Sequence, residues 1–189
     1  MKISSDSKIL VLGATGLIGT ELFSHLRHLG LNVTGTTRSK DVGDDGVLFF
    51  DGDLEGAVEA FPWETYDVIV DCTGVIDYSQ SEESVRINTA VNVEMPLSIL
   101  KKLKKKHHYF YSSTHAVLLP KEDHNPYVAS KVQFEKEIEA QKDVQPTVTV
   151  LRLPAVFSEL RRSGLLYSIK DHFLKKESLE LSFRSHVWH

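Results

Sequence analysis

Short runs of apolar residues alternate with longer amphipathic stretches along the chain. The apolar runs are rich in valine and isoleucine, which favour strands, whereas the amphipathic stretches are rich in helix formers. The pattern predicts helices at residues 17–29, 83–105 and 126–141, a short one near 54–60, and one or two after Gly164. It predicts six strands, at residues 8–12, 31–37, 47–50, 68–72, 108–112 and 148–153.

The predicted strands are apolar at nearly every position, as in KILVL at residues 8–12 and VIVDC at residues 68–72. Such runs indicate burial on both faces, which is typical of a parallel sheet, and their alternation with helices indicates βαβ units. We therefore predict an α/β fold, a Rossmann-type doubly wound parallel sheet in three layers, α/β/α. The chain has no repeat, low-complexity tract or linker, so residues 1–189 are expected to form a single domain.

The charge balance argues against two classes of partner. With 22 basic and 26 acidic side chains, the net charge is −4. The chain as a whole therefore has no electrostatic reason to bind nucleic acid or an anionic membrane, and we expect neither. The basic run KKLKKKHH at residues 101–108 lies at the end of a predicted helix. Positive charges there interact favourably with the negative end of the helix dipole and are usually solvated. A nucleic-acid contact is the alternative.

Cysteine and histidine usage argue against disulfides and metal. Cys72 is the single cysteine, which excludes an intrachain disulfide and fits a reducing compartment. The nine histidines have no carboxylates or cysteines at ligand spacing, so no metal site is expected. The apolar stretch at residues 9–18 is too short to span a bilayer, and no cleavage signal follows it. We expect a cytoplasmic protein.

The motif GATGLIG places Gly13, Gly16 and Gly19 between the first predicted strand and the first helix. Glycines there permit a tight turn, close approach of a phosphate to the backbone, and packing of the helix on the strand. A pyrophosphate would also meet free amide groups and the positive end of the helix dipole. The motif predicts dinucleotide binding, and its other candidate cofactor residues are Thr15, Leu17 and Ile18.

The second predicted strand ends in TTRSK. An acidic residue at this position commonly binds the ribose hydroxyls of NAD, whereas an arginine accommodates the 2′-phosphate of NADP. Arg38 therefore favours NADP, and Lys40 could take its place. The alternatives are a solvated arginine and the use of NAD.

Tyr127 and Lys131 lie four residues apart in HNPYVASKVQ, on one face of a predicted helix. An ammonium one turn beyond a tyrosine can stabilise its phenolate and lower the tyrosine pKa from its ordinary value near ~10. The same spacing is also found in ordinary surface pairs. Pro126 in the first turn and Asn125 as N-cap indicate where the helix begins.

Seven motifs in one order resemble the extended short-chain dehydrogenase/reductase family, which includes nucleotide-sugar epimerases, dehydratases and reductases. The resemblance covers about residues 8–158. The motifs are GATGLIG, DGDL, CTGV, NVEMPLSIL, YSST, PYVASK and LRLPAVF.

The resemblance implies a catalytic group of Thr114, Tyr127 and Lys131. Tyr127 would exchange a proton with the substrate oxygen while hydride moves to or from the nicotinamide, and Thr114 would hold that oxygen. Lys131 would anchor the nicotinamide ribose. The other cofactor contacts that the resemblance implies are Asp53 and Leu54 at the adenine, Cys72, Thr73 and Gly74 beside the adenosine, Asn92 in the following helix, and Pro154 facing the nicotinamide amide.

Three of these positions have alternative explanations. Asn92 could bond only to backbone groups, with Asn88 as its substitute at the cofactor. Gly74 could serve only a turn at a strand end, and Pro154 could act only as a strand breaker.

The chain departs from the family pattern at the substrate side. Leu118 and Leu119 follow the serine motif where the family often has tyrosine and glycine, and Ser158 replaces a glycine. Residues 159–189 would be a reduced substrate-side segment, so little or no separate substrate domain is expected. The substrate would then be small, or a partner subunit would complete the site, or the cofactor would serve another purpose.

We expect an NADP-dependent oxidoreductase or epimerase that acts on a sugar nucleotide or a related carbonyl compound, as in surface-polysaccharide synthesis. The alternatives are a non-catalytic NAD(P)-binding or redox-sensing module and a subunit that completes a partner's site. The family also implies a homodimer. Its contact residues would be Val91, Met95, Ile99, Val132 and Phe134, whose spacing equally suits packing on the sheet.

Overall fold

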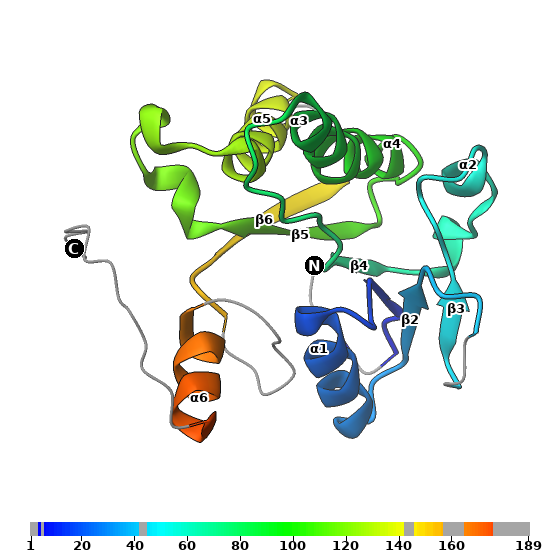
Figure 1. The fold of residues 1–189 in the computed structure, drawn as a ribbon. Coiled ribbons are helices and arrows are strands. Elements are labelled where there is room, and N and C mark those ends of the chain that lie inside the picture. The colour runs from blue at the N-terminus through cyan, green and yellow to red at the C-terminus, as the bar shows by residue number, and fades with distance from the viewer. Residues whose placement is uncertain (1–3, 5, 42–44, 142–145, 157–164, 176–189) are drawn as a thin grey trace. The chain divides into compact units, whose positions relative to one another are not determined.

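Six parallel strands form one sheet in the order β3-β2-β1-β4-β5-β6 (Figure 1). The computed structural model describes residues 4, 6–41, 45–141, 146–156 and 165–175. It confirms the six predicted strands and the doubly wound order, which reverses between β1 and β4. The strands are β1 (Ile9–Leu12), β2 (Val33–Thr37), β3 (Val47–Phe49), β4 (Val68–Asp71), β5 (His108–Thr114) and β6 (Thr147–Leu153).

Helices cover both faces of this sheet, with α3, α4 and α5 on one side and α1 on the other (Figure 1). Alternate residues of β1 therefore enter two cores. Leu10 and Leu12 pack on the side of α4 and α5, whereas Ile9 and Val11 pack with Phe23 of α1. The helices are α1 (Leu17–His28), α2 (Ala57–Ala60), α3 (Glu82–Thr89), α4 (Met95–Leu100) and α5 (Pro126–Ala140), with a π-helical turn η2 (Ala90–Glu94) and the 3-10 turns η1 (Trp63–Thr65), η3 (His115–Leu118) and η4 (Lys121–Asp123).

The chain divides into two compact units, Met1–Ala155 and Val156–His189. The sheet and the helices up to α5 belong to the first unit. The second contains α6 (Leu165–Lys175), a helix expected after Gly164. Ser158, at the departure from the family's glycine, lies outside the described residues.

The helix predicted at residues 83–105 is observed as three consecutive pieces, α3, η2 and α4, and it ends at Leu100. The backbone stays helical without a gap from Glu82 to Leu100, so the predicted helix is confirmed except that it includes a π turn and ends five residues earlier than expected. The extra residue in a π turn does not interrupt the apolar pattern, and such turns are frequent at functional sites.

The basic run at residues 101–108 follows α4, with Lys101 as its C-cap. Its lysines contact glutamates on the surface: Lys104 Nζ lies 2.6 Å from Glu64 Oε1. Lys106 Nζ lies 3.6 Å from the other oxygen of Glu64. The run is therefore partly neutralised by neighbouring carboxylates.

Two residues that we considered for a dimer contact lie in the core instead. Ile99 of α4 and Phe134 of α5 are fully buried against the sheet. For them the alternative, packing on the sheet, is correct. Asn125 caps α5, because its Oδ1 accepts a hydrogen bond of 3.0 Å from the amide of Val128, as predicted.

No helix in the described part of the chain has the length and apolarity needed to cross a bilayer.

Phe134→Ala should lower the free energy of unfolding by about 3–5 kcal/mol, because it leaves a cavity where an aromatic ring was fully buried. The Phe134 ring stacks on Tyr111 with centroids 3.8 Å apart. Urea denaturation measures the change. The control is Leu29→Ala, whose side chain is exposed and should change stability by less than about 0.5 kcal/mol. Equal losses in both variants would contradict this account of the core.

Candidate active site

A cavity of about 410 Å³ lies at the carboxyl ends of β1, β2 and β4. Doubly wound sheets bind ligands at this edge, beside the point where the strand order reverses, and the volume suits a small molecule. The predicted cofactor residues that line it are Gly13, Thr15, Gly16, Arg38, Asp53, Cys72, Thr73 and Gly74.

The glycine loop brings α1 very close to the end of β1. Gly13 has a φ of +73°, which glycine adopts without strain. A Cβ on Gly19 would overlap the carbonyl group of Gly13, so the helix could not pack here with a larger residue. Gly16 is the N-cap of α1 and has no side chain to bond the first-turn amides. This cradle fits a pyrophosphate, which those amides and the helix dipole would hold.

Threonines at the end of β2 support the loop, and the sequence analysis missed them. Thr36 Oγ1 accepts a hydrogen bond of 3.1 Å from the amide of Gly13, and the Thr15 and Thr37 hydroxyls lie 3.0 Å apart. Small polar residues in TTRSK, directly before Arg38, were the available signal. The other cavity residues that were missed are Ser39, Phe50, Asp51, Gly52, Val91 and Met95.

Arg38 and Asp53 face each other at the cavity. Arg38 Nη1 lies 3.9 Å from Asp53 Oδ2, and both side chains are mostly exposed. An exposed pair at this distance is weak, so either group remains available to a ligand. A 2′-phosphate or a ribose hydroxyl could each find a partner here.

A buried carboxylate, Asp71, organises the end of β4. Its Oδ1 accepts a hydrogen bond of 2.8 Å from the amide of Thr73 and another from the Thr73 hydroxyl. Its Oδ2 accepts one from the Tyr109 hydroxyl. Burial, together with the charge of Asp71, raises the pKa of the neighbouring Cys72 thiol to about 12. Cys72 is therefore a neutral thiol at the cavity wall.

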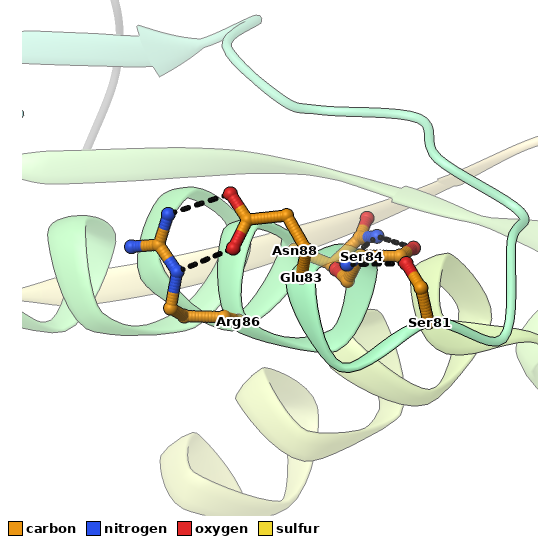
Figure 2. Close-up of polar contacts among 5 residues, drawn as sticks. All are labelled: Ser81, Glu83, Ser84, Arg86 and Asn88. Carbon is orange, nitrogen blue, oxygen red and sulfur yellow. Dashed lines mark hydrogen bonds and ion pairs between the residues drawn. The ribbon is translucent and has the colours of Figure 1, made fainter.

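Asn92 lies in the π turn and bonds to the loop that follows β4. Its Oδ1 accepts a hydrogen bond from the Val75 amide and its Nδ2 donates to the Val75 carbonyl, each at 3.0 Å. Nδ2 also lies 3.0 Å from Ser130 Oγ of α5. Asn92 therefore bonds backbone groups of the loop, as one explanation of this residue expects, and side chains of α3 and α5 as well. Asn88, one turn earlier, bonds the same loop, and Figure 2 shows it beside Ser84 on α3.

Thr114, Tyr127 and Lys131 come together at the ends of β5 and α5. Thr114 is the last residue of β5, and its side chain is among the groups that act on the pKa of Tyr127, near the start of α5. Lys131 follows one turn later and is almost fully buried. Its Nζ donates to the carbonyl of Ser112 at 2.9 Å and lies 4.4 Å from the centroid of the Tyr111 ring.

Lys131 was expected to lower the pKa of Tyr127, and this lowering is not found. Lys131 Nζ is 5.9 Å from the centroid of the Tyr127 ring, and it is not among the groups that shift the Tyr127 pKa. Burial, with Tyr78 nearby, raises the pKa of Tyr127, and the effect of the Thr114 side chain only partly opposes this. Burial also lowers the pKa of Lys131 to about 8, against the charges of Asp71 and Glu135. At neutral pH Tyr127 is a protonated phenol that can donate a proton.

An ion pair between the buried Glu135 of α5 and the exposed Arg152 of β6, which the sequence analysis missed, fixes α5 on the sheet. Glu135, one turn after Lys131, accepts a hydrogen bond of 2.5 Å from Ser113 Oγ on β5. Arg152 of β6, which is opposite Ser113 in the strand register, donates to Glu135 Oε2 from Nη2 at 2.6 Å and from Nε at 3.0 Å. Ser112 and Ser113, the two residues before Thr114 on β5, thus hydrogen-bond to Lys131 and Glu135 on two successive turns of α5.

The remaining predicted residues lie away from the cavity lining. Leu17 and Ile18 are half-buried in the first turn of α1. Leu54 is exposed after β3, and Pro154 is exposed after β6. Within the described residues, no group of three or more histidine, cysteine, aspartate or glutamate side chains could hold a metal ion.

The model of the "NAD dependent epimerase/dehydratase family" matches residues 9–182. No curated protein sequence matches the chain.

Solved structures share this fold at low sequence identity. The UDP-glucose 4-epimerase of Thermotoga maritima, solved with UDP-glucose, has a TM-score of 0.75 and 19% identity, covering 94% of this chain and 66% of that one. The Thermus thermophilus UDP-glucose 4-epimerase complex with NAD has a TM-score of 0.72 and 20% identity, covering 91% and 64%. The UDP-glucuronic acid 4-epimerase of Bacillus cereus, in complex with NAD, has a TM-score of 0.70 and 17% identity, covering 90% and 63%. The chain thus spans less than two thirds of the length of these structures.

Glu135→Gln should lower the free energy of unfolding by about 1–3 kcal/mol, because a buried carboxylate that accepts from Ser113 and Arg152 is replaced by a neutral amide. Thermal and urea unfolding measure the loss. The matched control is Glu83→Gln, which breaks an exposed pair with Arg86 on α3 (Figure 2) and should leave the midpoint unchanged. A Glu135 variant as stable as the wild type would show that the pair does not hold α5 in place.

Proposed function

The chain belongs to the NAD dependent epimerase/dehydratase family, and we propose that it is an NADP-dependent oxidoreductase or epimerase of the short-chain dehydrogenase/reductase type. The proposal rests on one observation above all. Tyr127 and the neighbouring Thr114, with Lys131 one turn after Tyr127, lie at the same edge of the sheet as the glycine-loop cavity. A proton donor and a dinucleotide cradle at one edge are the parts that hydride transfer to a carbonyl needs.

In this function the residues of the chain have separate tasks. A bound dinucleotide would supply or accept the hydride. Tyr127 would donate its proton to the carbonyl oxygen as that oxygen gains electrons, or accept it in the reverse direction. Thr114 would hold the same oxygen by a hydrogen bond. Lys131 would hold the ribose through its ammonium group.

The NADP preference rests on Arg38, a cation at the end of β2 beside the cavity. Asp53, 3.9 Å away, competes for that cation, and it is also a group that could bind ribose hydroxyls. The Bacillus cereus and Thermus thermophilus structures contain NAD, so NAD is the alternative cofactor.

A sugar nucleotide is the proposed substrate class, because the Thermotoga maritima structure holds UDP-glucose on the same fold. We propose that residues 1–189 act as one dinucleotide-binding domain, that 159–189 contribute at the substrate side, and that the protein works as a cytoplasmic homodimer in polysaccharide synthesis. The reducing compartment is supported by the single cysteine. The high pKa of Cys72 disfavours redox sensing at this thiol.

Tyr127→Phe should reduce turnover about 10²–10⁴-fold, because it removes the proton donor, while dinucleotide affinity stays within about twofold. Loss of NADPH absorbance with a panel of 4-keto sugar nucleotides measures turnover, and NADPH fluorescence measures binding. The control is Tyr66→Phe, a tyrosine of the core cluster, which should keep wild-type turnover. Full activity in the Tyr127 variant would refute its role.

Arg38→Ala should weaken NADPH binding about 10–100-fold, through loss of a charged hydrogen bond to the 2′-phosphate, and leave NADH binding nearly unchanged. Fluorescence titration with both dinucleotides gives the ratio. Arg86→Ala is a matched control, since Arg86 has the same 69% side-chain exposure as Arg38 but lies on α3. An equal effect on both dinucleotides would contradict the NADP assignment.

A further inference from the structure

The loop after β4, at residues 72–81, is held in place by a row of buried side chains. Asn92 bonds both backbone groups of Val75 at 3.0 Å. The carbonyl of Asp77 accepts hydrogen bonds from Asn88 Nδ2 at 2.9 Å and from Ser84 Oγ at 3.2 Å. Ser84 and Asn88 are fully buried, and Asn92 almost so.

These three anchors lie four residues apart, so they form one stripe along α3 and the π turn. Ser81 begins the stripe as the N-cap of α3, where its Oγ accepts from the Ser84 amide at 3.1 Å (Figure 2). Surface loops are usually less well bonded than this. The backbone around Val75 and Asp77 therefore has a fixed position relative to α3.

The fixed backbone carries two exposed apolar side chains, Ile76 and Tyr78, with 60% and 58% of their surfaces accessible. The Tyr78 ring meets the Tyr127 ring edge to face, with centroids 6.0 Å apart and planes at 76°. The exposed part of Tyr78 is thus directly beside the candidate proton donor. A rigid aromatic side chain in this place contributes little burial to the fold, whereas it offers a preformed surface to a bound molecule.

We propose that Ile76 and Tyr78 form a substrate wall, in which Tyr78 packs against the C–H face of a sugar ring whose reacting carbon lies at Tyr127. The proposal rests on the proposed function. A pyranose ring has apolar C–H groups on its faces and hydroxyls at its edge, so an aromatic ring can cover a face while polar groups bind the edge. The wall selects ring-shaped carbonyl and hydroxyl substrates over small open-chain ones.

The experiment is a calorimetric titration of UDP-glucose, and in parallel dTDP-glucose, into the full chain saturated with NADP⁺ or NAD⁺. Tyr78→Ala should weaken sugar-nucleotide binding at least about tenfold, because the ring is lost. Tyr78→Phe keeps the ring and should bind within about threefold of the wild type. Ile76→Ala should show a smaller loss in the same direction. Because both side chains are exposed, these variants should fold normally.

The controls separate the wall from the rest of the site. Val85→Ala, on the exposed surface of α3, should leave sugar-nucleotide binding unchanged. Dinucleotide affinity should stay within about twofold in every variant, since Ile76 and Tyr78 do not line the cavity among the described residues.

If Tyr78→Ala bound the sugar nucleotides as tightly as the wild type, the proposed substrate wall would be refuted. A wild-type protein that binds dinucleotide but neither sugar nucleotide would also overturn it, while the dinucleotide site stands. A wild-type protein that binds no dinucleotide at all would refute the proposed function itself.

Discussion

A buried ammonium group constrains the whole carboxyl edge of the sheet. Lys131 is almost inaccessible to water, and a charge in such a position is costly unless polar and charged groups surround it. The Ser112 carbonyl and the face of the Tyr111 ring lie within contact distance of Nζ, and the charges of Asp71 and Glu135 oppose the effect of burial on its pKa. Each of these groups comes from an element that must be correctly placed before Lys131 can be buried.

The placement of α5 follows from this requirement. Lys131 and Glu135 are one turn apart, and they bind Ser112 and Ser113, which are consecutive on β5. Arg152 joins β6 to the same carboxylate. Helix and strand are thereby held in one register, and that register brings Thr114 to Tyr127. The proximity of these two side chains is thus a consequence of polar contacts made deeper in the structure.

Much of this architecture could be predicted from the sequence, because strands buried on both faces have a simple apolar signature. The glycine loop was also predictable, since Gly13 and Gly19 are required by a backbone conformation and a close contact. The hydrogen-bond partners of Asp71 and Glu135 could not be predicted in this way. A buried carboxylate is bonded by residues far along the chain, such as Tyr109 and Arg152, and the sequence pattern does not show which ones. The pattern of apolar positions also contains no signal for the π turn.

The expected Tyr127 pKa was wrong for a related reason. Spacing alone identified a lysine on the same helix face, but it gave no measure of burial. Burial acts on both groups in the direction that disfavours charge, so it raises the pKa of the phenol and lowers that of the ammonium. At neutral pH Tyr127 is therefore a neutral phenol, whereas Lys131, with a pKa of about 8, remains mostly an ammonium group.

Gly74 lies where three parts of the structure meet: the glycine-loop cavity, the loop after β4 and helix α5. It lines the cavity, and a Cβ there would lie 3.3 Å from Asn92 Oδ1 and 3.5 Å from Lys131 Nζ. Its φ is not in the positive range, so a glycine-only turn does not explain the residue. Close approach explains it better: a Cβ at Gly74 would crowd the Asn92 amide that holds the loop after β4, and it would already be in van der Waals contact with the Lys131 ammonium. The missing side chain lets the glycine-loop cavity, the loop after β4 and helix α5 share one corner of the sheet.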